Sequence, residues 1–411
     1  MIPEQMAWLP RSDTADPWMR AAILSSSAAV ADRLLLALIK DPGDADPSGM
    51  ARLQTDLAVT VGAVGNPESV DLVLAAAASS TADPAAAFAV VAGLGDGLAR
   101  SKKSLADILA RNPAAAGLLD RAAAASADPK SAPALRAQAV ELLRHAPFEK
   151  ARDAILPLLD PRHPAEVQLA AVRALGSFPD AALPALLLPR RAAASPAVRA
   201  EILEILLRRA AWIPAVLDAV EAGTIAVTDL PTGRRSTLQN HADPKIRVRA
   251  VKLFAAPPAG KRTETIARYQ KAVADGRGER AKGREVFLKN CATCHTLAGL
   301  GTSVGPDLGS IRHRSPEEIV THILDPNREV APDFVGYVVS LKDERVLTGI
   351  IAAEAGSAVT LRRAGGEQDV VLRDDIAAMA GTGKSLMPEG LEKAITPGEM
   401  GDLVAFLRSP E

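Results

Sequence analysis

Four stretches of the sequence repeat one apolar pattern: LRAQAVELL at residues 135–143, VQLAAVRAL at 167–175, VRAEILEIL at 198–206 and IRVRAVKLF at 246–254. The first, fifth, sixth and ninth positions of each stretch are apolar, and this spacing traces one face of an α-helix. A proline stands two or three residues ahead of each stretch, where its missing N–H costs a starting helix nothing: Pro133, Pro164, Pro196 and Pro244. The pattern predicts four amphipathic helices.

The stretches follow one another after 32, 31 and 48 residues, so we expect an insertion between residues 221 and 239. A helix that cannot bury its apolar stripe alone buries it against the next repeat, as in an α-solenoid. The segment resembles HEAT repeats, and degenerate copies upstream extend the expected array over about residues 10–255. The alternative is an irregular all-α domain whose periodicity arises by chance.

Composition favours close-packed helices and excludes several classes of protein. Only 3% of the 411 residues are aromatic whereas 48% are hydrophobic, so the core must be aliphatic. The 48 basic and 49 acidic residues give a net charge of −1, and we expect no nucleic-acid partner. Two cysteines cannot build a disulfide scaffold, and no apolar run reaches the roughly 18 residues of a membrane span, so we expect neither a disulfide scaffold nor an integral membrane protein.

The chain changes character after residue 255. Pro257-Pro258-Ala259-Gly260 ends the repeats, a polar helix follows, and Gly276 and Gly278 form a joint. We expect a helical repeat domain at 1–255, a linker helix at 256–276 and a second domain at 277–411. Its expected elements are helices at 280–288, 315–324 and from 396 onward, and strands at 337–341, 346–351, 358–361 and 370–372.

The sequence Cys291-Ala292-Thr293-Cys294-His295 carries the chemistry of the second domain. Two thiols at this spacing can add to the two vinyl groups of one haem, and the adjacent imidazole then binds the iron, as in c-type cytochromes. A structural zinc site would need two further ligands, for example His295 and His313. A thioredoxin-like redox pair would need a βαβ context, which a helix followed by a glycine-rich loop does not supply.

An electron-transfer haem usually has a second axial ligand, and a methionine thioether raises its reduction potential. Met400 lies on the apolar stripe of the last helix and Met379 in an apolar stretch, so packing explains both. Met387 lies in an irregular loop between glycines, and it is the predicted ligand. His313 could replace it if Met387 does not bind.

Residues 277–411 resemble the haem-binding domain of many planctomycete and verrucomicrobial proteins, a variant of the class I cytochrome c fold. The resemblance rests on motifs in a fixed order: Cys-x-x-Cys-His at 291–295, VGPDL at 304–308, Arg314, ILDP at 323–326 and SLMPEGL at 385–391. It implies a mainly α protein, in which a HEAT-like solenoid precedes a cytochrome c domain with a small antiparallel β insertion. In such proteins a β-propeller dehydrogenase often lies upstream, and this sequence has none.

By position, the resemblance implies four haem-binding residues: Cys291, Cys294, His295 and Met387. The carbonyl of Pro306 would accept the N–H of the ligand imidazole. Arg314 would be a partner for a haem propionate, since its planar fork matches a carboxylate. Gly283 and Phe287 would let the first helix of the domain cross the last one at Phe406 or Leu407.

We therefore expect a mono-haem c-type electron carrier rather than an enzyme, with one covalent haem c per chain. It would relay electrons from a dehydrogenase to a downstream acceptor, with the solenoid as docking scaffold. The alternatives are a haem enzyme or gas sensor with an open distal site, and an interaction scaffold whose cysteines hold zinc.

The compartment follows from the chemistry of haem attachment, which takes place outside the cytoplasm in bacteria. We therefore expect a periplasmic or otherwise exported protein. The one signal-like stretch, residues 20–31, fits a first repeat helix better, because Asp16-Pro17-Trp18 precedes it. The expectation is that the sequence is a fragment of a longer exported protein, or has a misplaced start.

Overall fold

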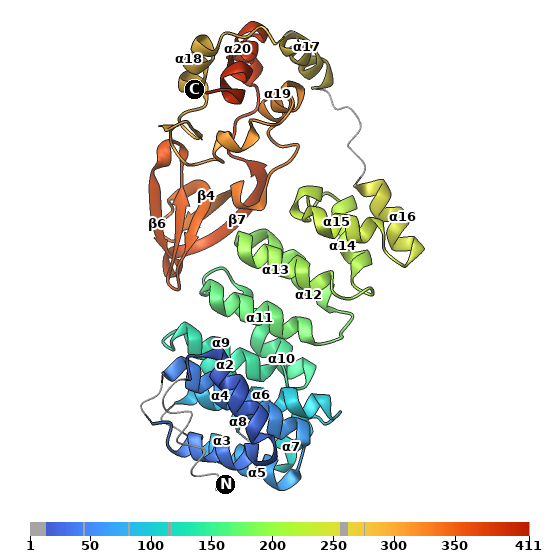
Figure 1. Cartoon of the computed structure of the whole chain (residues 1–411), viewed down its shortest axis with the longest axis vertical. Helices are drawn as coiled ribbons and strands as arrows, with labels where there is room; N and C mark the ends of the chain where they lie inside the picture. The colour runs from blue at the N-terminus through green and yellow to red at the C-terminus, as the bar shows by residue number, and fades with distance from the viewer. Residues whose placement is uncertain are drawn as a thin grey trace. The chain divides into compact units, whose positions relative to one another are not determined.

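The computed structural model describes residues 14–43, 46–80, 83–113, 115, 117–254, 262–274 and 276–410 (Figure 1). The chain divides into two compact units, Met1–Asp180 and Ala181–Glu411. The expected boundary between residues 255 and 256 lies outside the described residues, and so does the Pro-Pro-Ala-Gly break.

The described part of the first unit is built from helices. The α-helices are α2 (Pro17–Ser27), α3 (Ala31–Lys40), α4 (Pro47–Val64), α5 (Pro67–Ser79), α6 (Pro84–Arg100), α7 (Leu105–Arg111), α8 (Leu118–Ala127), α9 (Pro133–Leu143), α10 (Phe148–Ile155) and α11 (Ala165–Ser177). Short 3-10 helices follow two of them, η2 (Ala28–Val30) and η3 (Leu156–Leu159). Close packing of α4 on α6 depends on small residues: a Cβ at Gly62 would lie 2.2 Å from the Leu94 carbonyl oxygen. The core is aliphatic, as the composition predicts.

The repeat stretches at 135–143 and 167–175 form α9 and α11, so these helix predictions are confirmed. Of the four apolar positions that the stretches share, three are fully buried in α9. All four are fully buried in α11, where Val167, Ala171, Val172 and Leu175 are 0% exposed. Pro133 is the first residue of α9 and Pro164 caps α11. The HEAT-like character of the array stays a prediction.

The N-terminal helices contain a longer apolar run than the sequence analysis expected. Residues Pro17–Lys40 form a helical run of 24 residues that is long and apolar enough, by length and composition alone, to cross a membrane. Asp32 and Arg33 interrupt the run in the sequence, which hid its length. Its most apolar window is 33% buried, and Leu34, Leu35 and Leu38 are fully buried. A core helix and a signal sequence both have this composition.

The second unit opens with further helices: α12 (Leu183–Leu187), η4 (Pro189–Ala193), α13 (Pro196–Leu206), α14 (Ile213–Glu221), η5 (Val227–Asp229), α15 (Thr232–Gln239) and α16 (Pro244–Leu253). The stretches at 198–206 and 246–254 form α13 and α16, as predicted. The expected insertion contains η5 and α15, and α15 packs against α16. One of the apolar positions departs from the pattern, since Val251, the sixth residue of the last stretch, is 51% exposed.

A five-stranded antiparallel sheet forms the predicted β insertion, with strand order β6-β5-β4-β3-β7. Its strands are β3 (Val335–Leu341), β4 (Val346–Glu354), β5 (Ala358–Arg362), β6 (Gln368–Leu372) and β7 (Ile376–Ser385). Four of these strands were predicted. β7 was not, because its alanines and glycines have low β propensity. Pairing with β3 makes it a strand, with Val339 opposite Met379.

The remaining elements of the second unit precede or follow the sheet or connect its strands, and the α-helices among them share one apolar core. They are α17 (Thr263–Val273), α18 (Arg280–Asn290), β1 (Thr296–Leu297), β2 (Leu300–Gly301), η6 (Leu308–Ile311), α19 (Pro316–Leu324), η7 (Pro332–Phe334), η8 (Ala364–Gly366), η9 (Arg373–Asp375), η10 (Leu391–Lys393) and α20 (Pro397–Arg408). Capping boxes open α19 at Ser315 and α20 at Thr396, as the sequence indicated.

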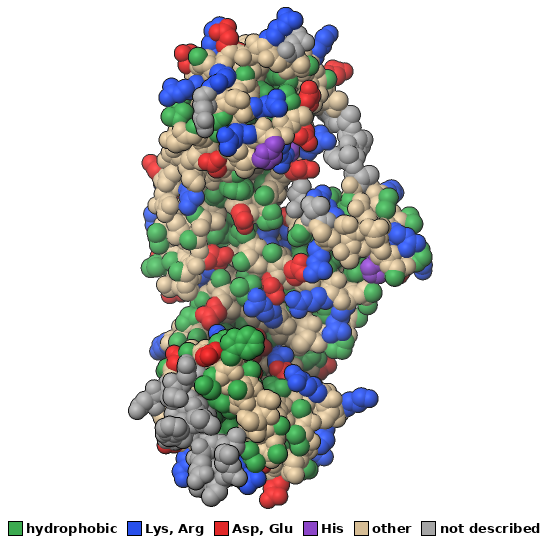
Figure 2. All heavy atoms as spheres, in the orientation of Figure 1, with side chains coloured by type: hydrophobic (Ala, Val, Ile, Leu, Met, Phe, Trp, Pro, Cys, Tyr) green, Lys and Arg blue, Asp and Glu red, His purple; other side chains and the backbone are tan. Residues whose placement is uncertain are grey.

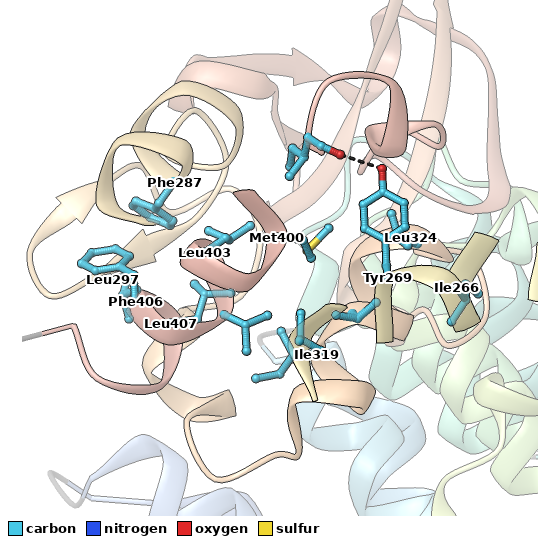
Figure 3. Packing of buried hydrophobic residues seen from close by; sticks show 14 residues of the cluster. Ile266, Tyr269, Phe287, Leu297, Ile319, Leu324, Met400, Leu403, Phe406 and Leu407 are labelled. Atoms are coloured by element: carbon cyan, nitrogen blue, oxygen red, sulfur yellow. Dashed lines mark hydrogen bonds between the residues drawn. The ribbon is translucent and has the colours of Figure 1, made fainter. Parts of the chain in front are cut away.

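Figure 3 shows how this core is filled. The rings of Phe287 on α18 and Phe406 on α20 contact each other in a tilted arrangement, with centroids 5.7 Å apart, at the helix crossing that the resemblance implied. Tyr269 comes from α17, the helix expected to be a linker, and is 1% exposed. Its hydroxyl donates to the carbonyl oxygen of Ile395 over 2.8 Å. The structure thus places α17 in the same core as α18 and α20.

Buried polar contacts connect the sheet to the helices that open the second unit. The Tyr337 hydroxyl on β3 donates to the Ala194 carbonyl oxygen over 3.0 Å and accepts from Arg199 Nη1 over 3.3 Å. Arg191 pairs with Asp229 over 2.7 Å, and both side chains are less than 8% exposed. Breaking a buried charge pair usually costs several kcal/mol. These contacts hold the β insertion against η4 and α13.

The surface carries no dominant charge. Figure 2 shows acidic and basic side chains interspersed over the face in view, with hydrophobic side chains between them. This distribution agrees with the net charge of −1 and gives that face no extended field of one sign.

The crossing of α18 and α20 predicts the effect of a single methyl group. A Cβ at Gly283 would lie 2.0 Å from the backbone oxygen of Asp402, so Gly283→Ala must push the two helices apart. We expect a loss of about 2–3 kcal/mol in the free energy of unfolding, measured by denaturant titration. Gly398→Ala on α20 is the matched control, because its Cβ would meet no described atom within 4 Å. Equal stabilities for the two variants would contradict this packing.

Candidate functional site

The Cys-x-x-Cys-His motif continues directly from the end of α18. The N–H of Cys291 donates to the Phe287 carbonyl over 2.8 Å and so closes the helix. The carbonyl of Cys291 then accepts the N–H groups of Cys294, at 3.0 Å, and of His295, at 2.9 Å. These bonds fold the motif into one tight turn that presents both thiols and the imidazole together.

Both cysteines are free and half-buried. Burial raises the pKa of the Cys291 thiol to about 12. Burial also raises the pKa of Cys294, although the N–H of Gly365 opposes it. The two thiols are therefore protonated at neutral pH, rather than poised as the thiolates that a redox pair uses.

His295 is oriented by the loop that follows it. Its Nδ1 lies 2.8 Å from the carbonyl oxygen of Pro306. A carbonyl can only accept, so Nδ1 carries the hydrogen, and Nε2 is left as the nitrogen able to bind a metal. Burial lowers the pKa of His295, against the effect of the Pro306 bond, and keeps the ring neutral. The structure thus places Pro306 where the sequence analysis expected it.

Two glycines let the loop pass this close to His295. A Cβ at Gly305 would lie 2.6 Å from the imidazole Cε1. Gly301 has a φ of +84°, and a Cβ there would lie 2.1 Å from the His295 carbonyl oxygen. The loop is tied back to the motif by the N–H of Val304, which donates to the Cys294 carbonyl over 3.0 Å. The loop therefore forms a cradle that an added methyl group would fill.

The β insertion also reaches the motif, which sequence reasoning missed. The N–H of Gly365, in the turn between β5 and β6, donates to the Thr293 carbonyl over 2.9 Å. Arg362 Nη1 donates to the Ser303 carbonyl over 2.7 Å. These residues lie about 60 to 70 positions from their partners in sequence, and no local pattern announces the contact. A signal was present only in the paired glycines Gly365-Gly366, which indicated a turn.

The three candidate methionines separate as the sequence analysis expected. Met400 is 0% exposed in the core around α20, and Met379 is 3% exposed in the core of the sheet. Met387 is half-buried and lies in the loop between β7 and η10. Its N–H donates to the Ser385 Oγ over 3.1 Å. Met387 is therefore the one of the three that packing does not already explain, and its role as a ligand stays a prediction.

Arg314 is exposed and contacts a histidine. Its Nη1 lies 2.7 Å from His322 Nε2, which must accept because a guanidinium can only donate. Burial, and then the charge of Arg314, lower the pKa of His322 and keep its ring neutral. This contact fixes the direction of Arg314 beside the start of α19. Its pairing with a propionate stays a prediction.

The donor set fits a covalently attached haem better than a zinc ion. Two thiols share a turn with an imidazole whose Nδ1 is already used, and glycines let the following loop pass close to the ring. Zinc would need further ligands around the thiols. Among the described residues, no group of three or more His, Cys, Asp or Glu side chains is placed to hold a metal ion.

Comparison with known proteins agrees with this assignment. Residues 280–410 match the family model of cytochrome c. The match begins at the first residue of α18 and extends just beyond α20, so it includes the motif, the β insertion and the methionine loop. No curated protein matches the chain. The second unit thus contains a cytochrome c domain, a type of domain that binds haem and supports electron transfer.

The cradle around His295 predicts the effect of filling it. Gly305→Ala places a methyl group against the imidazole, so the ring must turn or the Pro306 carbonyl must move away. We expect haem to remain attached, because both thiols are untouched, while the electron paramagnetic resonance of the ferric protein changes with the ligand plane. Gly398→Ala serves again as the control. An unchanged resonance in Gly305→Ala would contradict the proposed orientation of His295.

Proposed function

We propose that this chain is an electron-transfer protein whose cytochrome c domain carries one haem, bound covalently through Cys291 and Cys294 with His295 and Met387 as axial ligands. The observation that carries the proposal is the imidazole of His295. It follows the two thiols in a single turn and is held by Pro306 with Nε2 free. That arrangement suits an iron ligand, because the bond to a carbonyl fixes both the tautomer and the plane of the ring.

Haem iron, when bound, would supply a one-electron redox couple. Its reduction potential would be set by the ligands and the apolar surroundings that the chain provides. The Pro306 carbonyl makes the imidazole of His295 more basic and fixes its plane. A thioether from Met387 would favour the ferrous state and so raise the potential. The buried apolar side chains around α18 and α20 keep water away from one side of the site and lower the local dielectric.

The helices before the cytochrome domain would act as a docking scaffold. The contacts of Tyr337 with Ala194 and Arg199 support this role, because they join the β insertion to η4 and α13 through fully buried groups. The insertion in turn contacts the haem motif through Gly365. A partner bound to η4 or α13 would thus contact helices that are joined to the β insertion.

The redox partners would be a dehydrogenase as donor and a downstream protein as acceptor, and the protein would work outside the cytoplasm. Attachment of haem to a Cys-x-x-Cys-His motif supports export. The apolar run Pro17–Lys40 does not add to this support, since a core helix has the same length and composition as a signal sequence.

The ligand assignment is tested by Met387→Ala in the exported holoprotein. Both thiols and His295 are unchanged, so we expect full haem attachment. Loss of the thioether should lower the reduction potential by about 0.1–0.3 V, a fraction of the roughly 0.8 V that axial ligands span. The measurement is a spectroelectrochemical titration.

Met379→Leu is the matched control, because Met379 packs inside the sheet and should leave the potential unchanged. A potential that does not move in Met387→Ala would refute the assignment of this ligand. Rapid binding of cyanide or carbon monoxide to the wild-type iron at neutral pH would instead indicate a haem enzyme or gas sensor with an open distal site.

A further inference from the structure

The loop that carries Met387 has little structure of its own. Residues 386–390, all of them described, form neither helix nor strand, and they connect the end of β7 at Ser385 to η10 at Leu391. Gly390 has a φ of +93°, so the chain turns sharply at the end of the loop. The place of the thioether must therefore be fixed by contacts from outside the loop.

One side chain spans the two ends of this loop. Asn327 follows α19 and lies 58 residues before Ser385 in the sequence. Its Oδ1 accepts the N–H of Ser385 over 2.9 Å, and its Nδ2 donates to Glu389 Oε1 over 2.7 Å. Both bonds are well within normal hydrogen-bond length.

The first of these bonds extends to the methionine itself. Ser385, held at its N–H by Asn327, accepts the N–H of Met387 at its own Oγ over 3.1 Å. Two consecutive hydrogen bonds thus connect the Asn327 side chain to the backbone of Met387. The second bond, to Glu389, fixes the chain two residues beyond the methionine.

Asn327 follows a helix that is packed into the core of the domain. It follows α19, whose Leu324 is 1% exposed in the core of the cytochrome domain. Arg262, just before α17, donates to the Leu324 carbonyl at the end of α19. It also pairs over 3.0 Å with Glu392, in the 3-10 helix that follows the Met387 loop. The base and the loop are therefore tied together at more than one point.

We infer that Asn327 is the positioning residue for Met387, and that it keeps the thioether of the loop on the iron. This inference rests on the proposed role of Met387 as axial ligand. An amide suits the place because it offers one acceptor and donors at the same site, whereas a carboxylate offers acceptors alone and an apolar side chain offers neither. The thioether bond to iron is weak enough for such bracing to matter, since exogenous ligands compete with it.

The test uses Asn327→Ala in the exported holoprotein. Two hydrogen bonds of ordinary strength correspond to about a 30-fold change in an equilibrium, so the population with the loop open should rise about 30-fold. We expect cyanide to bind the ferric iron correspondingly faster, and the sulfur-to-iron charge-transfer absorption of the ferric protein to weaken. Asn240→Ala is the control, because Asn240, directly after α15, also makes a side-chain hydrogen bond, from its Nδ2 to the Ser236 carbonyl. It should change neither readout.

Two substitutions that together exchange donor and acceptor in the bond between residues 327 and 389 separate positioning of the loop from a general loss of stability. Asn327→Asp retains an acceptor for Ser385 but sets a second carboxylate against Glu389, so it should also speed cyanide binding. Adding Glu389→Gln restores that bond with donor and acceptor exchanged, and should return the rate to within about threefold of wild type. Failure of the double variant to recover would overturn the inference, as would a lower melting temperature in Asn327→Ala with unchanged cyanide binding.

The outcome also separates this inference from the proposed function. If Met387→Ala alters the potential and the charge-transfer absorption but Asn327→Ala leaves cyanide binding at the wild-type rate, Met387 is the ligand and Asn327 does not position it. If Met387→Ala alters neither property, the ligand assignment fails, and the inference about Asn327 fails with it.

Discussion

The hydrogen bond from His295 Nδ1 to the Pro306 carbonyl is the contact on which the site depends. It sets the tautomer of the ring, and it requires residues 300–306 to pass against the imidazole. That approach in turn requires glycine at 301 and 305, where a Cβ would lie within 2.6 Å of His295 atoms. A short chain of steric requirements thus gives the imidazole of the motif one orientation, with Nδ1 directed at the Pro306 carbonyl.

Contacts from distant elements complete the site. The turn between β5 and β6 reaches Thr293 through Gly365, and Asn327 after α19 reaches the loop that carries Met387. The β insertion is held on its other side by Tyr337, whose hydroxyl bonds with Ala194 and Arg199 among the helices of the same unit. The insertion therefore connects the Cys-x-x-Cys-His motif to η4 and α13.

The features that the sequence predicted well are those with a local cause. The apolar face of α11 follows from a spacing within nine residues, and the start of α19 follows from the capping box of Ser315 and Glu318. The assignment of Cys291, Cys294 and His295 rests on five consecutive residues, and the turn that joins them is local as well.

The features that could not be predicted from the sequence depend on partners far along the chain. β7 has few strong strand formers and becomes a strand because β3 lies beside it. Tyr269 looked like part of a polar linker, yet its ring lies in the core and its hydroxyl bonds with Ile395, 126 residues away. Asn327 gave no local signal, and the paired glycines Gly365-Gly366 indicated a turn but not its contact with Thr293.

The central claim is that a haem is attached through Cys291 and Cys294. The most direct measurement is the mass of the tryptic peptide that spans residues 290–312, taken from the chain after export in a host with working haem-attachment machinery. The account predicts that this peptide carries the mass of one haem and keeps it after acid–acetone extraction. A peptide of unmodified mass with two free thiols, from a host that attaches haem to another cytochrome, would contradict the account.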